Sequence, residues 1–110
     1  MKPIQVKSVQ DALQAFVNRD VYLHIETTTG AYAAMVVCAY VRNAVIRFSR
    51  ATIAGTGPYR VGLQMDHGWT YAEGLTDWTL DEQGRLLLAG HDADGRLAVS
   101  LQLSLTPFHV

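Results

Sequence analysis

The run from Leu97 to Leu105 constrains the fold more than any other part of the chain. Leucine or valine stands at every second position of this run, with alanine, serine or glutamine between them. Successive side chains of an extended backbone point to opposite faces, so this pattern predicts a strand with one face in a core and the other in water. Such strands are typical of antiparallel sheets. We therefore expect a mainly β protein.

Turn residues divide the rest of the chain into short segments. From Ser8 to Asn18 the spacing of apolar residues predicts one short amphipathic helix, with Ser8 as its capping residue. The segments that follow are predicted to be strands, at residues 21–26, 31–42, 45–53, 59–65, 69–73, 75–80, 85–90 and 97–105. Short links such as Asp94-Gly95 join antiparallel neighbours. We predict a single domain, residues 1–110, in which the helix precedes an antiparallel meander of about seven or eight strands that curls into a partly open barrel.

Composition limits the class of partner. The chain is 49% hydrophobic and 17% charged, which is the balance of a globular protein. Its net charge of -1 provides no general attraction to nucleic acid or to an anionic membrane. No apolar run reaches the roughly 20 residues that span a bilayer, and the first residues lack a secretion signal. We expect a cytoplasmic protein without a cofactor, whose single cysteine, Cys38, is buried and unreactive.

Charged residues are unevenly distributed along the chain. No acidic residue occurs between Glu26 and Asp66, although Arg42, Arg47, Arg50 and Arg60 fall in that interval. Pairing of charges across strands would account for this distribution. The alternative is a cationic patch for an anionic ligand, or complementary patches that support self-association.

Aromatic and polar residues share one face of several predicted strands. Alternation places Tyr22, His24 and Glu26 opposite the apolar positions of the first strand. If the strands share a sheet, one face carries a candidate ligand-binding groove, since aromatic rings supply contact area and a few polar groups supply orientation. The alternative is the ordinary preference of aromatic residues for strands. The candidate binding residues are Tyr22, His24, Glu26, Tyr32, Arg42, Trp69, Tyr71 and Glu73.

Two other functions compete with a non-catalytic binding protein. A small hydrolase or metal-dependent enzyme would use His24, Glu26, Glu73 and His91 as acid–base groups or ligands, although no diagnostic ligand spacing or nucleophile motif is present. A structural homodimer would pair the long segment 31–42 with its copy, because an exposed apolar edge strand invites such pairing.

Several strings of the sequence resemble one family of proteins. They are His24–Tyr32, Ala39–Ala44, Gly57–Leu63, Gly68–Thr76, and Ala89–His91 together with Leu97–Leu103. On these strings the chain resembles the YojF-like family of small, uncharacterised bacterial proteins. The resemblance implies a mostly β fold and no known catalytic residues. It also suggests an accessory role in low-molecular-weight thiol (bacillithiol) metabolism, with an LmbE-like deacetylase as a partner by genomic neighbourhood.

Overall fold

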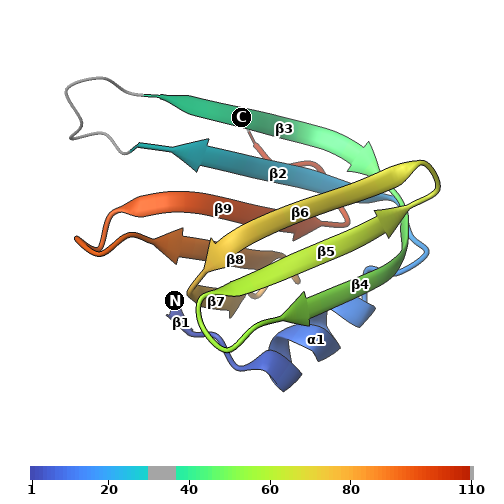
Figure 1. Ribbon diagram of the computed structural model, residues 1–110. Coiled ribbons are helices and arrows are strands. Elements are labelled where there is room, and N and C mark those ends of the chain that lie inside the picture. The colour runs from blue at the N-terminus through green and yellow to red at the C-terminus, as the bar shows by residue number, and fades with distance from the viewer. Residues whose placement is uncertain (30–36, 110) are drawn as a thin grey trace.

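Two antiparallel sheets and one helix enclose a single core. The structure is a computed structural model that describes residues 1–29 and 37–109. One sheet has six strands in the order β1-β7-β8-β9-β2-β3, and the other has three in the order β4-β5-β6 (Figure 1). The elements are β1 (Lys2–Pro3), α1 (Val6–Gln14), β2 (Val21–Thr28), β3 (Cys38–Ile46), β4 (Phe48–Ala54), β5 (Tyr59–Met65), β6 (Gly68–Leu75), β7 (Asp77–Leu80), β8 (Leu86–His91) and β9 (Leu97–Ser104).

The expectation of a mainly β, antiparallel fold with one short helix is confirmed, and the sheets are not closed into a barrel. The chain leaves the larger sheet after Ile46, forms the three-stranded sheet, and returns at Thr76 to begin β7. Strand β9 then pairs with both β8 and β2, which brings the last strand beside the first long one. Local alternation could not reveal this pairing, because it joins segments that are distant in the sequence.

The helix begins earlier than expected. It starts at Val6, so Ser8 lies inside it and the capping position belongs to Gln5, which makes no capping hydrogen bond with its side chain. The Ser8 hydroxyl instead donates to Gln5 Oε1 at 3.3 Å. Beyond Gln14, the amide of Phe16 bonds to the carbonyl of Leu13 in a tighter turn. Phe16 and Val17, the last apolar residues of the predicted helix, therefore contact the core from beyond the end of the regular helix.

Asn43 is not the expected turn between two strands. It lies within β3 with φ of +52°, where the register of β2 against β3 shifts between Leu23 and Ile25. Two β3 residues, Arg42 and Asn43, therefore stand opposite His24 in a β-bulge. Asparagine favours left-handed backbone in bulges as well as in turns, so its sequence signal did not distinguish them. Residues 31–36 of the predicted strand 31–42 lie outside the described residues, Val37 precedes β3, and residues 38–42 form its start.

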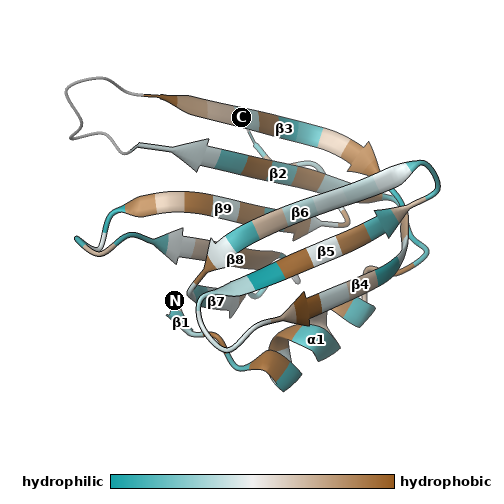
Figure 2. Ribbon diagram, viewed as in Figure 1, coloured by the Kyte–Doolittle hydropathy of each residue, from teal (hydrophilic) through white to brown (hydrophobic). Residues whose placement is uncertain are grey.

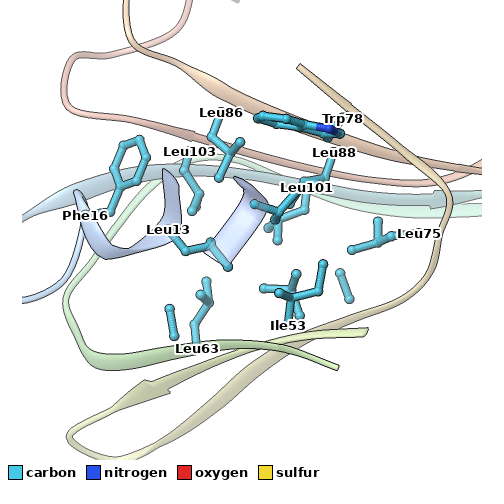
Figure 3. Packing of buried hydrophobic residues seen from close by; sticks show 14 of the residues in the cluster. Leu13, Phe16, Ile53, Leu63, Leu75, Trp78, Leu86, Leu88, Leu101 and Leu103 are labelled. Atoms are coloured by element: carbon cyan, nitrogen blue, oxygen red, sulfur yellow. The ribbon is translucent and has the colours of Figure 1, made fainter. Parts of the chain in front are cut away.

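The core lies between the two sheets and against α1 (Figure 3). Hydrophobic and hydrophilic residues alternate along strands such as β5 (Figure 2). Val99, Leu101 and Leu103 of β9 are buried as expected. Helix α1 also satisfies the free edge of β4, because the Gln10 amide donates to Ala51 O at 2.8 Å and accepts from Ile53 N at 3.1 Å.

The two sheets come into close backbone contact at a pair of glycines, Gly74 near the end of β6 and Gly90 near the end of β8. A Cβ at Gly90 would lie 2.6 Å from Val99 Cγ1 and would overlap the backbone of Gly74. The two backbones can come this close only because glycine has a hydrogen atom where other residues have a side chain. Next to this contact, the amide of Thr76 bonds to the carbonyl of Ala89 at 2.9 Å. The contact fixes where the chain crosses from β6 to β7.

Cys38 is exposed at the start of β3, which corrects the expected buried position. Strand β3 is the outermost strand of its sheet, so its side chains lack neighbours on one side. Within the described ranges, no helix is long and apolar enough to cross a membrane.

Candidate functional site

A shallow groove of about 400 Å³ lies on the face of the six-stranded sheet that points away from the core. Its floor is low because Ser100 of β9 and Ala89 of β8 are paired neighbours with small side chains. Glu26 pairs with Ser100 from the other side, and His24 pairs with Gln102. We call this hollow the outer groove. It is lined by Met1, His24, Glu26, Arg42, Leu88, Ala89, His91, Leu97, Ser100 and Gln102.

An ion pair forms one wall of the outer groove. Arg42 Nη2 lies 3.0 Å from Glu26 Oε1, and both side chains are partly shielded, with 35% and 24% of their surface exposed. The bulge at Arg42 and Asn43 turns the arginine toward β2, and its guanidinium also lies 4.8 Å from the centre of the Tyr40 ring. A charge pair held from two sides offers a fixed cation and a fixed anion to a ligand.

His24 is buried on the same face. The C-terminal segment folds over it, and the Phe108 ring centre lies 4.0 Å from the His24 ring centre. Asn43 holds this segment in place: its amide donates to Phe108 O at 2.9 Å and accepts from Phe108 N at 2.8 Å. Within the described chain, His24 Nε2 is buried and has no hydrogen-bond partner. A buried polar atom left in this state costs stability unless something binds it.

Burial lowers the pKa of His24 below its ordinary value, and the nearby Arg42 guanidinium lowers it further, while a hydrogen bond with Asn43 opposes both. The ring is therefore neutral near pH 7, and it has one donor and one acceptor nitrogen. A neutral imidazole beside a fixed ion pair is suited to orienting a polar ligand by hydrogen bonding.

The opposite wall of the outer groove contains His91. Its Nδ1 lies 3.2 Å from the Thr76 hydroxyl and 3.2 Å from Asp77 Oδ1. The Thr76 hydroxyl also donates to Asp77 Oδ1 at 2.7 Å. This hydrogen bond, with the neighbouring His91, lowers the pKa of Asp77 although desolvation opposes the shift. The three side chains hold the His91 ring in a fixed orientation at the rim.

The lowered pKa of His24 predicts how stability depends on pH. As pH falls through about 6.5, the unfolded chain takes up this proton before the folded chain does, so the free energy of unfolding decreases until the lower folded pKa is reached. One proton can contribute a slope of at most about 1.4 kcal/mol per pH unit. Urea unfolding at several pH values between about 7.5 and 5 measures this dependence of the free energy of unfolding on pH.

Replacing His24 with glutamine should flatten this slope. Equal slopes in wild type and His24→Gln would contradict the prediction.

The candidate residues do not form the single face expected from the sequence. His24, Glu26 and Arg42 line the outer groove, and Tyr22 lies on the same face beyond it. Trp69, Tyr71 and Glu73 belong to β6 of the three-stranded sheet and point away from the core there. The expectation of one shared face is wrong because β6 belongs to the three-stranded sheet, whereas β2 and β3 belong to the six-stranded sheet. Tyr32 lies outside the described residues.

The same division separates the residues of the enzyme hypothesis. His24, Glu26 and His91 line the outer groove, whereas Glu73 does not. Among residues 1–29 and 37–109, no three histidine, cysteine, aspartate or glutamate side chains are close enough to hold a metal ion. Sequence reasoning also missed Ser100, Gln102 and Ala89. Their alternation with the buried Leu101 and Leu88 indicated that they lie on the outer face of their strands. Only the pairing registers of β9 with β2 and β8 place them beside Glu26 and His24.

A larger hollow, about 720 Å³, opens between the two sheets beside Gly74. Its lining combines the apolar residues Ile25, Ala72 and Val99 with polar side chains, which are those of Thr27, Tyr71, Glu73, Thr76 and His91. The outer groove is the better candidate site because its lining includes the Glu26–Arg42 ion pair and His24, whose buried Nε2 has no hydrogen-bond partner among the described residues.

These features define a two-sheet β protein with a polar, ligand-sized groove on the outer face of its larger sheet. The chain belongs to the family described as "Protein of unknown function (DUF1806)", whose model matches residues 3–108. This membership confirms the resemblance found in the sequence. The chain is 53% identical over 116 residues to the "Uncharacterized protein YojF" of Bacillus subtilis (strain 168), with 100% of both chains covered. The crystal structure of Bacillus subtilis YojF protein is similar, with a TM-score of 0.87 and 51% identity, over 99% of this chain and 97% of that one.

Proposed function

We propose that this chain is a cytoplasmic, non-catalytic binding or accessory protein that holds a small polar molecule in the outer groove. The observation that carries the proposal is the buried, unpartnered Nε2 of His24 in a groove that also presents the Glu26–Arg42 pair. Buried polar groups are normally satisfied, so a ligand that reached this nitrogen from the groove would complete its hydrogen bonding.

The groove favours a ligand with an anionic group and several hydroxyl or amide groups. Arginine has five N–H donors, and Arg42 uses contacts to Glu26 and to the carbonyl of Val41, which leaves donors for an anion. Ser100 and Gln102 add groups that both donate and accept. Glu26 would bind a cationic or hydroxyl group of the same molecule.

The family resemblance supports a narrower version of this proposal. A low-molecular-weight thiol of the bacillithiol type, or a precursor of one, carries the mixture of charged and hydroxyl groups that this groove would accept. We extend the proposal to an accessory role in that metabolism, with an LmbE-like deacetylase as the protein partner.

A ligand screen with matched variants tests the binding proposal. Wild-type protein would be tested by saturation-transfer NMR against amino acids, sugars, sugar phosphates and low-molecular-weight thiols. We expect at least one binder, with affinity reduced about tenfold or more in Arg42→Gln, because a charge-assisted hydrogen bond contributes about 1.5–3 kcal/mol. Ser100→Leu, which fills the floor, should abolish binding.

Tyr71→Ala is the matched control, because it removes an aromatic ring from the outer face of the other sheet. Binding that survives both groove variants, or no binding by any compound at about ten millimolar, would contradict the proposal. Turnover of a bound compound that is lost in His24→Gln would favour the hydrolase alternative instead.

The exposed edge of β3 favours a second proposal, that two copies of the chain associate. Strand β3 is the outermost strand of its sheet, and Tyr40, Val41 and Val45 are exposed on it at 62%, 42% and 55%. An antiparallel copy of β3 would satisfy the free backbone groups and cover these side chains. Light scattering of the purified chain would give the mass of two chains, and a single-chain mass at high concentration would contradict the proposal.

A further inference from the structure

A second polar–aromatic surface lies on the outer face of the three-stranded sheet, which no helix or strand of the described residues covers (Figure 1). The strand registers place its residues in rows: Arg50, Gln64 and Trp69 form one, and Thr52, Gly62 and Tyr71 the next. In the third row, Arg60 pairs with Glu73. We call this surface the aromatic platform and define it by Arg50, Arg60, Gly62, Trp69, Tyr71 and Glu73.

The two rings of the platform are stacked and open to solvent. Their centres lie 5.5 Å apart with their planes 7° from parallel. Trp69 is 43% exposed and Tyr71 is 49% exposed. Two large aromatic side chains that remain this accessible on an uncovered sheet leave apolar surface in water, which is unusual unless the surface binds something.

Gly62 at the centre of the platform makes room for the rings. A Cβ there would lie 2.9 Å from Tyr71 Cε1 and 3.5 Å from Trp69 Cζ3. Both rings therefore lean across β5 over the bare glycine backbone. The hollow beside them has a volume of about 190 Å³ and reaches Arg50 and Arg60.

Cations lie on two sides of the rings. The Arg60 guanidinium is 5.5 Å from the centre of the Tyr71 ring and 3.7 Å from Glu73 Oε1. Arg50 lies in the row of Trp69 and, among the described residues, has no ion pair. Arginine binds phosphate through its planar donors, and aromatic rings bind other planar rings by stacking.

We propose that the aromatic platform binds one free nucleoside phosphate, with the base on the exposed outer face of the Trp69–Tyr71 stack and the phosphate at Arg50 and Arg60. A sugar alone would not use the guanidinium groups, and an anionic peptide would not use the rings. The net charge of -1 provides no long-range attraction for a nucleic-acid strand. This site is separate from the outer groove and does not depend on the function proposed for it.

Titration with adenosine monophosphate, followed by chemical shifts and by calorimetry, tests this proposal. We expect saturable binding, weakened about tenfold or more in Trp69→Ala and in Tyr71→Ala, because stacking on one base contributes about 1–3 kcal/mol. Adenosine alone and inorganic phosphate alone should each bind at least about tenfold more weakly, because each engages half of the site. Arg50→Gln should remove most of the difference between the nucleotide and adenosine.

Arg42→Gln is the control, because it alters the outer groove and leaves the platform intact. Unchanged affinity in this variant supports a separate site, whereas a loss would place the nucleotide in the groove and overturn the proposal. No binding at about ten millimolar, or equal binding by Trp69→Ala with wild-type melting temperature, would also overturn it. An oligoadenylate that binds more than about tenfold tighter per molecule would show that the site takes a strand rather than a free nucleotide.

Discussion

Replacing Gly90 with alanine is expected to lower the free energy of unfolding by about 3 kcal/mol, the upper end of the usual effect of overpacking a tight site. The added methyl group would overlap the backbone of Gly74 and lie 2.6 Å from Val99 Cγ1. Backbone cannot move aside by changing a rotamer, so β6 would have to lift from β8. Urea denaturation followed by circular dichroism measures the change, because a two-state transition gives the free energy directly.

The control for this prediction is another glycine with space around it. At Gly95, in the turn between β8 and β9, a Cβ would meet no atom within 4 Å, and the backbone φ is +78°. Asparagine tolerates that backbone, so Gly95→Asn should change stability by less than about 1 kcal/mol. A Gly90→Ala protein as stable as Gly95→Asn would show that the two sheets do not need this contact.

Replacing Phe48 with alanine is expected to cost about 3–5 kcal/mol, the range for removing a buried phenylalanine. Phe48 begins β4 and is fully buried in the core. Its carbonyl also accepts a hydrogen bond from the amide of Asn18 at 2.8 Å, which joins the turn after α1 to the smaller sheet. The cavity would therefore weaken the attachment of both the helix and β4.

Leu80→Ala is the control, because Leu80 is 49% exposed and its truncation removes little buried surface. Denaturant midpoints of the two variants should differ widely, with Leu80→Ala close to wild type. A Phe48→Ala midpoint near that of Leu80→Ala would contradict the burial and packing described for Phe48.

Most strands could be predicted from the sequence because their signal is local. Residues 59–65 were expected as a strand and form β5. The alternation from Leu97 onward predicted β9 to within one residue and the burial of Val99, Leu101 and Leu103, whereas Leu97 and Leu105, expected on the same buried face, are exposed. The signals that failed were those with two meanings. Asn43 marks a left-handed residue, which serves a bulge here rather than a turn. Ser8 is a good capping residue, yet the helix already begins at Val6.

The candidate site was predictable in part. Alternation along β2 placed His24 and Glu26 on one face, and the structure brings Arg42 to them. Alternation did not show that Trp69 and Tyr71 lie on the outer face of the other sheet, because that depends on which strands share a sheet. Nor could it show Phe108 covering His24, a contact between residues 84 positions apart in the chain.

The sequence by itself determined the class of the fold, the positions of most strands and the buried face of strands such as β5 and β9, because side-chain alternation is set within a few residues. It did not do so for β3, none of whose residues is buried. The tertiary structure alone decided that the strands divide into two sheets and that the aromatic residues divide between two surfaces. The reason is physical: pairing of β9 with β2, and the contact of Gly74 with Gly90, depend on backbone surfaces meeting across the chain. Such contacts leave no periodic mark on the residues that make them.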